Sequence, residues 1–360
     1  MVSGNRHTSN LRKVRSKLLP PAPASCRLPT AVCVLILSLV TPAVLAQTNG
    51  WKKQPAGTMA WLHGIYFLDQ NRGWAVGSKG TFLATLDGGN SWQVKPAPST
   101  DVLRDIFFID DQNGWLVCEK NVYDLKEKDE PRTYLMQTTN GGEDWKRVNI
   151  IGVDVNIRLV RVVFSRGARG WIFGEAGAIY TTRDGGANWT RLISPTRHLL
   201  LGGVFIDDDR GWLVGAGATI IQTADGGDTW HVSRLPQATE NAVRFTATSF
   251  VDNRLGWAVG SGGSIYQTIN GGRTWQIQRS GVSTDLYDVK FLNALEGWAV
   301  GAEGTIIHTI DGGLRWTTQR SGTVHPLERI FFVDRKHGWA VGFGGTVVTY
   351  LPIEAPTLHR

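Results

Sequence analysis

Short segments in which apolar and polar residues alternate recur along the chain, and their landmarks keep the same order in every copy. A phenylalanine stands seven residues before the tryptophan of each Gly-Trp pair, and the residue two positions earlier is usually Ile or Val. The phenylalanines are Phe67, Phe108, Phe164, Phe205, Phe250, Phe291 and Phe332. Alternation with a period of two predicts a β-strand at each of these positions.

The Gly-Trp pairs define a repeat of about 41 residues. They place tryptophan at positions 74, 115, 171, 212, 257, 298 and 339, so most neighbours are 41 residues apart. Seven units of this length are typical of the blades of a β-propeller.

A second motif, T-x-D-G-G-x-x-W with Asp or Asn at the third position, follows six of the pairs. It ends at Trp92, Trp145, Trp189, Trp230, Trp275 and Trp316. Asp or Asn can bond its own turn backbone, the glycines accept positive φ, and the tryptophan can pack between sheets. The motif therefore predicts a turn before an outer strand, and hence four antiparallel strands in each unit. We interpret both motifs as scaffold.

The seventh unit ends near Tyr350 without this motif, and the N-terminus can supply the missing strand. Trp51 precedes Trp74 by 23 residues, the separation that also relates Trp92 to Trp115. The spacing predicts an all-β, seven-bladed propeller over residues 47–360, closed by an N-terminal strand that leaves no exposed sheet edges. Trp61 alone among the 15 tryptophans has no repeat position.

Charge is distributed unevenly along the chain. The formal net charge is +7, but residues 1–46 hold six basic residues and no acidic ones, leaving 32 basic against 31 acidic residues. A nearly neutral remainder argues against nucleic acid as a partner.

The same 46 residues have the layout of a secretory signal peptide. A basic region precedes the apolar run Ala31 to Val40, and small residues precede Gln47. We expect cleavage after Ala46 and export to the periplasm, the thylakoid lumen or the extracellular space. An uncleaved anchor is the alternative, although a span needs about 20 apolar residues. We expect no transmembrane span after cleavage.

Cys118 is the single cysteine expected in the mature chain, which excludes an internal disulfide and a cysteine cluster for metal. Neither Cys26 nor Cys33 stands at the cleavage position, so we do not expect a lipid-anchored N-terminus.

The T-x-D-G-G-x-x-W motif resembles the Asp-box of bacterial sialidases and sortilin-type receptors. The chain combines this motif with seven G-W-A-V-G-like segments over residues 48–350. In this combination it is similar to the photosystem II stability and assembly factor family. The resemblance implies a non-enzymatic lumenal or periplasmic propeller that binds newly made D1 reaction-centre protein. Relatives in bacteria without photosystem II leave open a second role, that of a secreted or periplasmic adaptor for another protein.

Two features depart from the photosynthetic members. Many of these carry a lipoprotein cysteine after the signal peptide, where this chain has Ala46-Gln47. The second unit also contains an insertion, residues 119–133.

One end of a propeller is the usual binding surface, because the loops before the inner strand and those between the second and third strands meet there. The candidate partner-binding residues at this end are Arg104, Arg158, Arg161, Arg244 and Arg329. Arginine suits carboxylate recognition. The alternative is ordinary surface charge, partly neutralised by Glu119, Glu175, Glu303 and Glu328. We expect a monomer with a protein partner.

An enzyme, in particular a sialidase-like glycosidase, is the remaining alternative. Tyr287 beside Asp288 is weak support for it, and the Arg-Ile-Pro signature of sialidases is missing. His63 and His198 lie near the expected mouth but show no ligand spacing. We therefore predict no catalytic residues, no cofactor and no metal site.

Overall fold

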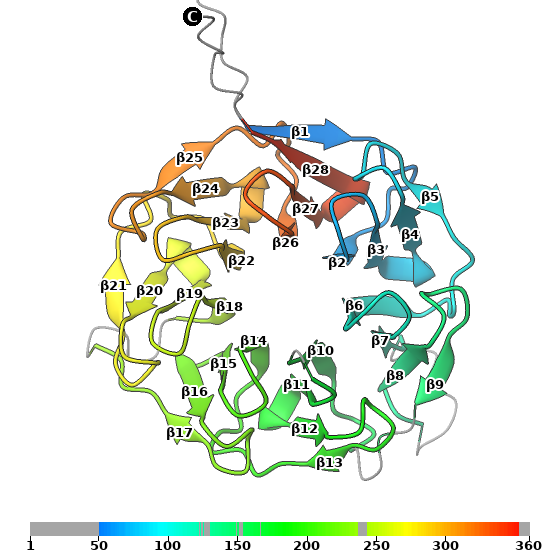
Figure 1. The fold of residues 1–360 in the computed structure, drawn as a ribbon, viewed down its shortest axis with the longest axis horizontal. Coiled ribbons are helices and arrows are strands. Elements are labelled where there is room, and N and C mark those ends of the chain that lie inside the picture. Colours follow the sequence, from blue (N-terminus) through cyan, green and yellow to red (C-terminus); the bar gives the residue numbers. More distant parts are fainter. Residues whose placement is uncertain are drawn as a thin grey trace, which may run out of the picture. The chain divides into compact units, whose positions relative to one another are not determined.

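Seven four-stranded antiparallel sheets form a ring in the computed structural model of the chain (Figure 1). The structure describes residues 50–352 except 122, 124, 126–129, 149, 151–153, 166 and 237–242, so the predicted signal peptide lies outside the described residues. The prediction of a seven-bladed, all-β propeller is confirmed. The described part of the chain holds no helix capable of crossing a bilayer.

Each blade runs from an inner strand to an outer one. The inner strands are β2 (Leu62–Phe67), β6 (Val102–Phe108), β10 (Leu159–Phe164), β14 (Leu200–Phe205), β18 (Phe245–Phe250), β22 (Leu286–Phe291) and β26 (Leu327–Phe332). The second strands are β3 (Gly73–Gly77), β7 (Gly114–Glu119), β11 (Gly170–Gly174), β15 (Gly211–Gly215), β19 (Gly256–Gly260), β23 (Gly297–Gly301) and β27 (Gly338–Gly342).

The outer half of each blade follows in the same order. The third strands are β4 (Phe82–Thr85), β8 (Thr133–Thr138), β12 (Ile179–Thr182), β16 (Thr219–Thr223), β20 (Ile265–Thr268), β24 (Ile306–Thr309) and β28 (Thr346–Leu351). The outer strands are β5 (Gln93–Val94), β9 (Lys146–Val148), β13 (Thr190–Arg191), β17 (His231–Val232), β21 (Gln276–Gln278), β25 (Thr317–Gln319) and, closing blade 7, β1 (Gly50–Gln54).

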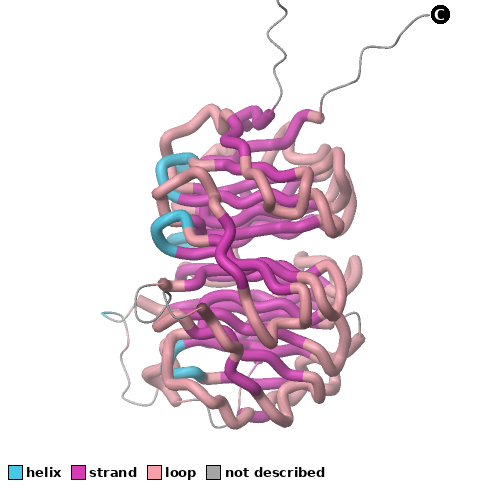
Figure 2. Tube along the Cα trace, turned by 90° about the vertical axis from the view of Figure 1, so that its left-hand side faces the viewer, coloured by secondary structure: helices cyan, strands magenta, loops and turns pink. Residues whose placement is uncertain are grey.

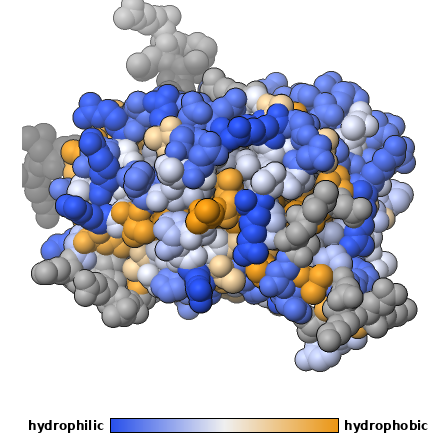
Figure 3. Space-filling view, turned by 90° about the horizontal axis from the view of Figure 1, so that it is seen from below, coloured by the Kyte–Doolittle hydropathy of each residue, from blue (hydrophilic) through white to orange (hydrophobic). Residues whose placement is uncertain are grey.

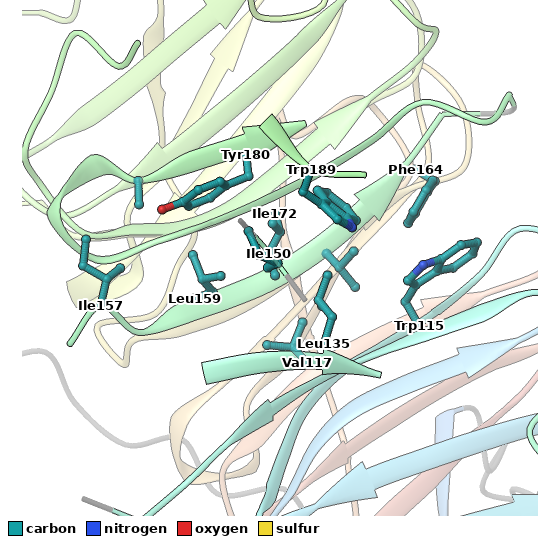
Figure 4. Packing of buried hydrophobic residues seen from close by; sticks show 12 residues of the cluster. Trp115, Val117, Leu135, Ile150, Ile157, Leu159, Phe164, Ile172, Tyr180 and Trp189 are labelled. Carbon is teal, nitrogen blue, oxygen red and sulfur yellow. The ribbon is translucent and has the colours of Figure 1, made fainter. Parts of the chain in front are cut away.

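The Gly-Trp tryptophans join neighbouring blades. Each ring stacks on the phenylalanine of the next blade; Trp257 and Phe291, for example, have ring centroids 3.4 Å apart and an interplanar angle of 4°. The Trp257 indole N–H also donates to the Gly312 carbonyl in the Asp-box of that blade, at 3.1 Å. Figure 4 shows the corresponding contact between blades 2 and 3, where Trp115 lies beside Phe164. The aromatic residues thus form both the core and the contact between sheets.

Glycine precedes each of these tryptophans because the phenylalanine of the same blade lies against it. A Cβ on Gly256 would stand 2.5 Å from the Phe250 ring, and all seven positions show the same close approach. The phenylalanine also meets the Asp-box tryptophan of its blade edge-on, as Phe250 does with Trp275 at 5.9 Å and 87°. One phenylalanine therefore contacts both tryptophan sets.

The Asp-box forms the predicted turn. In blade 3 the Gly186 N–H donates to Thr182 Oγ1 at 2.9 Å, and the Asn188 N–H donates to Asp184 Oδ1 at 2.9 Å. Gly185 has a φ of +69°, which a glycine accepts without strain. The turn is held by its own side chains and needs no ligand.

The ring closes through its two ends, as predicted. Strand β1 pairs antiparallel with β28, with Trp51 opposite Tyr350 (Figure 1). Trp51 is 7% exposed and meets Phe332 edge-on at 5.8 Å.

The closing strand should therefore contribute strongly to stability. We expect Trp51→Ala to lower the free energy of unfolding by about 3–5 kcal/mol, because it leaves a cavity in blade 7. Chemical denaturation of the purified protein measures this loss. Lys52→Ala, at an exposed position of the same strand, is the matched control. Equal stability of both variants would show that ring closure does not depend on Trp51.

The ionisation of Asp184 makes the stability of the fold depend on pH. Hydrogen bonds from Asn188 and Thr182 lower the pKa of Asp184 to about 2. Because this pKa lies below the value of about 3.9 in an unfolded chain, the contribution of Asp184 is present above about pH 4 and is lost as the pH falls toward 2.

Asparagine occupies this Asp-box position in blades 2 and 5, where Asn270 accepts the equivalent backbone N–H. We expect Asp184→Asn to fold normally and to lose stability less steeply between pH 4 and 2 in urea unfolding at stepped pH. Glu143→Gln, in the exposed Asp-box of blade 2, is the control. An unchanged pH slope in Asp184→Asn would refute this assignment.

Candidate partner-binding site

A β-bulge near the start of every inner strand turns one side chain out of the sheet. The register between inner and second strands shifts at the same place in all seven blades, for example between Leu103 and Asp105. The residues at the bulges are His63, Arg104, Val160, Leu201, Thr246, Tyr287 and Glu328. A bulge re-aims its side chain. All of these residues except His63 line one cavity of about 280 Å³, here called the mouth cavity.

Loops at the same end of the ring complete this cavity. The Ser261 N–H donates to the Arg244 carbonyl at 3.0 Å, which ties the turn after a second strand to the segment before an inner strand. Figure 2 shows the short helical turns that follow the second strands on one side of the ring. The loop residues lining the mouth cavity are Trp61, Arg158, Arg244, Ser261 and Asp285, and Arg329 also lines it. This arrangement confirms that the two sets of loops share one end.

The structure brings four of the five predicted arginines to this cavity, namely Arg104, Arg158, Arg244 and Arg329. Arg161 directly follows Val160, the bulge residue of its strand, and does not line the mouth cavity. The five residues come from blades 2, 3, 5 and 7. The fold thus gathers residues that share no single repeat offset.

Two of the arginines are neutralised by glutamates, as the alternative interpretation predicted. Arg104 Nε lies 2.5 Å from Glu119 Oε2, and Arg158 Nε lies 3.2 Å from Glu175 Oε1. Arg132, from the blade 2 insertion, bridges the two acids, with Nη2 2.8 Å from Glu119 and Nη1 3.6 Å from Glu175. These five residues form a chain of alternating charge over blades 2 and 3.

The insertion is only partly described. It lengthens the hairpin of blade 2, because Glu119 pairs with Thr133 at its outer end, and Lys120 forms an ion pair with Glu130. Residues 126–129 of the insertion lie outside the described residues.

Arg244 differs from its neighbours. Its residue is exposed, and no carboxylate of the described residues lies within 4.0 Å of its guanidinium. Its backbone N–H donates to Ser261 Oγ at 3.0 Å and its carbonyl accepts the Ser261 N–H, so its described hydrogen bonds are those of the backbone. Arg244 therefore presents the most available positive charge at the mouth cavity.

A charged cluster lies just beyond the bulges. Arg161 Nη2 stands 3.7 Å from Asp288 Oδ1, which joins blade 3 to blade 6 across the ring axis. Asp105 and Arg329 occupy the equivalent strand positions in blades 2 and 7. Burial raises the pKa of Asp105, although the charges of Arg161 and Arg329 oppose this rise.

Three guanidinium nitrogens of this cluster are buried without a hydrogen-bond partner among the described residues. They are Arg161 Nε, Arg161 Nη2 and Arg329 Nε. Since buried donors in proteins are usually satisfied, these atoms mark the arginines as the part of the site with unused hydrogen-bonding capacity.

Trp61 also lines the mouth cavity, and the sequence did not predict it as a site residue. Its indole N–H donates to Glu328 Oε2 at 3.0 Å, and its ring stacks on His63 at 5.4 Å. Burial raises the pKa of Glu328, but the neighbouring His63 and the charge of Arg329 outweigh it, so this pKa is lower than usual. The available signal was that Trp61 has no place in the repeat.

The residues weighed for catalysis have structural partners. Asp288 accepts the Ile330 N–H at 3.1 Å and pairs with Arg161. Burial and the nearby charges of Asp285 and Glu328 raise the pKa of Tyr287, which disfavours a phenolate nucleophile. His198 Nδ1 lies 2.9 Å from Thr219 Oγ1. Among the described residues, no group of three or more His, Cys, Asp or Glu side chains is arranged to hold a metal ion.

The chain is a closed seven-bladed β-propeller with Asp-box turns. Its mouth cavity lies at one end of the ring and is lined by arginines. The family model for the photosynthesis system II assembly factor YCF48 matches residues 43–102, 96–199, 194–281 and 276–351. The chain belongs to this family, as the sequence motifs predicted.

Individual relatives are distant. A photosystem II assembly lipoprotein Ycf48 of Synechococcus sp. (strain CC9902) is 36% identical over 64 residues, which is 18% of this chain. The chain thus matches about a fifth (19%) of that relative's length.

Similar solved structures share the fold. YCF48 from Cyanidioschyzon merolae has a TM-score of 0.68 at 20% identity, covering 84% of this chain and 99% of that one. A structure of YCF48 bound to a D1 peptide has a TM-score of 0.69 at 20% identity, covering 85% and 96%. A GH74 xyloglucanase from Xanthomonas campestris has a TM-score of 0.66 at 13% identity, covering 85% and 54%. The propeller architecture therefore does not by itself separate binding proteins from enzymes.

The pair across the axis should be essential to the stability of the site. Arg161 and Asp288 have side chains that are 13% and 11% exposed. Arg161→Met leaves buried carboxylates without their partner. We therefore expect it to lower the free energy of unfolding by about 3 kcal/mol at neutral pH.

In this variant we expect the pKa of Asp105 in the folded state to rise further, because the charge of Arg161 no longer lowers it. The destabilisation should therefore shrink as the pH falls and the carboxylates take up protons. Denaturation at neutral and acidic pH measures both effects. Arg254→Met, at an exposed turn at the other end of the ring, should change stability by less than about 0.5 kcal/mol. If Arg161→Met lowers the free energy of unfolding more at acidic pH than at neutral pH, this explanation is wrong.

Proposed function

We propose that the chain is a non-enzymatic, exported scaffold of photosystem II assembly or repair that binds a protein partner of the D1 type at the mouth cavity. Family membership over nearly the whole propeller is the observation that carries this proposal. A family member has been solved with a D1 peptide bound, which supports a peptide segment as the partner.

The mouth cavity suits an acidic segment. Arginine can bind a carboxylate through two parallel hydrogen bonds, and such charge-assisted bonds are stronger than neutral ones. Arg244 has no ion pair among the described residues, and Arg329 has an unused buried donor. A partner carboxylate would meet Arg244 first. Arg104 and Arg158 would join only by exchanging Glu119 and Glu175 for the partner's acids.

The size of the cavity favours a segment over a small-molecule substrate. About 280 Å³ is below the range of most ligand pockets, which bury a whole small molecule. The cavity is open to the loops around it, so an extended chain can place one or two side chains in it. Asp285, Asp288 and Glu328 are already engaged, and the raised pKa of Tyr287 disfavours a phenolate, which supports the absence of catalysis.

Export is proposed from the leader. Residues 1–46 have the order of a secretory signal, and the propeller begins directly after it. In a source without photosystem II, the same surface would serve as the protein-binding site of a periplasmic or secreted adaptor.

Binding of a fluorescent D1 peptide tests the proposal. We expect Arg244→Glu to weaken binding at least about tenfold in fluorescence anisotropy, because the reversed charge repels the acidic segment. Higher salt should weaken binding of the wild-type protein. Arg254→Glu, at the other end of the ring, should bind as the wild type does.

Three results would overturn the proposal. They are failure of the folded wild-type protein to bind the peptide, equal affinity for Arg244→Glu, and hydrolysis of a fluorogenic sialoside by the purified protein.

A further inference from the structure

Two exposed aromatic rings meet at the edge of the mouth cavity. Trp61, before strand β2, is 39% exposed, and Phe343, after strand β27, is 45% exposed. Their ring centroids are 5.4 Å apart and the rings are nearly perpendicular, at 84°. We call these two residues, from blades 1 and 7, the aromatic ledge. Trp61 also lines the mouth cavity, so the ledge and the arginines share one surface.

The fold does not require aromatic residues at either position. The residues equivalent to Trp61 in the other blades are Val102, Arg158, Leu199, Arg244, Asp285 and Pro326. Those equivalent to Phe343 are Ser78, Glu119, Glu175, Ala216, Ser261 and Ala302. Each of the two loops therefore forms in other blades without an aromatic ring, and packing of the scaffold does not explain the ledge.

Contacts beneath the rings hold them in place. Trp61 donates to Glu328 and stacks on His63, whose Nε2 lies 3.0 Å from Ser78 Oγ. Phe343 meets the His325 ring edge-on at 5.6 Å, and its N–H donates to the Pro326 carbonyl at 3.0 Å. A ring that is already ordered loses little conformational entropy on binding.

Exposed apolar side chains also occur elsewhere in the described part of the chain. Val232 in outer strand β17 is one of them. On the rim that Figure 3 shows, apolar surface is crossed by hydrophilic residues. Only at the mouth do two exposed aromatic rings of the described residues contact each other.

We propose that the aromatic ledge is a second subsite for the peptide, which takes a large apolar or aromatic side chain next to the acidic residue held by the arginines. This inference rests on the proposed function and specifies the chemistry of the partner. Because Trp61 and Arg244 line one cavity of about 280 Å³, the two side chains of the partner belong to one short segment. An extended chain advances about 3.3 Å per residue, so the apolar residue lies within a few positions of the acid.

Substitutions taken from the other blades test the ledge without disturbing the fold. Phe343→Ser introduces the residue of Ser78 and Ser261, and Trp61→Val introduces that of Val102. Trp61→Phe keeps a ring but removes the bond to Glu328. Leu314→Ser, in the Asp-box turn of blade 6 at a position 84% exposed, is the matched control.

Anisotropy with labelled D1 peptides gives the readout. One series of peptides has each apolar residue replaced by serine, and another has each acidic residue replaced by its amide. We expect Phe343→Ser and Trp61→Val to weaken binding of the parent peptide about tenfold or more, as loss of an aromatic anchor does. Trp61→Phe should retain most of the affinity, and Leu314→Ser all of it.

The peptide series assigns the contact. For one apolar-to-serine peptide, Phe343→Ser should cause no further loss, because the contact is already missing. All amide peptides should remain sensitive to Phe343→Ser, and the one that lacks the acidic residue held by Arg244 should lose most of its sensitivity to Arg244→Glu.

The outcomes separate this inference from the proposed function. If Arg244→Glu loses binding while Phe343→Ser and Trp61→Val bind normally, the ledge is not a subsite and only this inference fails. If concentration-dependent self-association is lost in the ledge variants while peptide affinity is unchanged, the ledge is instead a contact between copies of the chain. Loss of peptide binding in Leu314→Ser as well would also reject the ledge as the specific site.

Discussion

Stacking of each Gly-Trp tryptophan on the phenylalanine of the next blade is the interaction on which the rest of the structure depends. An aromatic pair contributes about 0.5–1.5 kcal/mol beyond the burial of its area. The contact recurs at all seven blade interfaces, including that between Trp339 and Phe67, where the first and last blades meet at 3.5 Å. The glycine before each tryptophan makes room for this contact, and in four of the seven blades the indole N–H also donates to an Asp-box carbonyl of the next blade.

This repeated core frees the ends of the strands for other roles. The blades are joined through strand positions that hardly vary. The bulge residues and the loops before the inner strands take no part in these contacts, so they can differ from blade to blade. They range from Arg104 to Leu201 and Glu328. Departure from the repeat is therefore informative in this protein. The mouth cavity and the aromatic ledge consist of residues that the scaffold does not specify.

The repeats predicted most of the fold. The seven blades, four strands per blade and closure by Trp51 all follow from spacings along the chain, since each landmark has a local structural reason. The placement of Arg104, Arg158, Arg244 and Arg329 at one end was also predictable, because loop connectivity decides which end a residue reaches. Their common cavity was not predictable, because it depends on bulges that the sequence does not mark.

Contacts between distant blades could not be predicted. The pair between Arg161 and Asp288 joins blades 3 and 6, and the bridge by Arg132 connects the insertion to two glutamates. Such pairs depend on the diameter of the closed ring and on side-chain reach. The sequence shows that Trp61 is an exception to the repeat. Its place next to the arginines could not be predicted, because it depends on how blades 7 and 1 lie side by side in the closed ring.

Hydrogen exchange of the protein with and without a D1 peptide tests the central claim most directly, because it maps the binding surface without any substitution. The account predicts slowed exchange in the segments around Trp61, Arg244, Glu328 and Phe343, with no change in the Asp-box turns at the other end of the ring. Protection confined to the Asp-box turns or to the outer strands would contradict it.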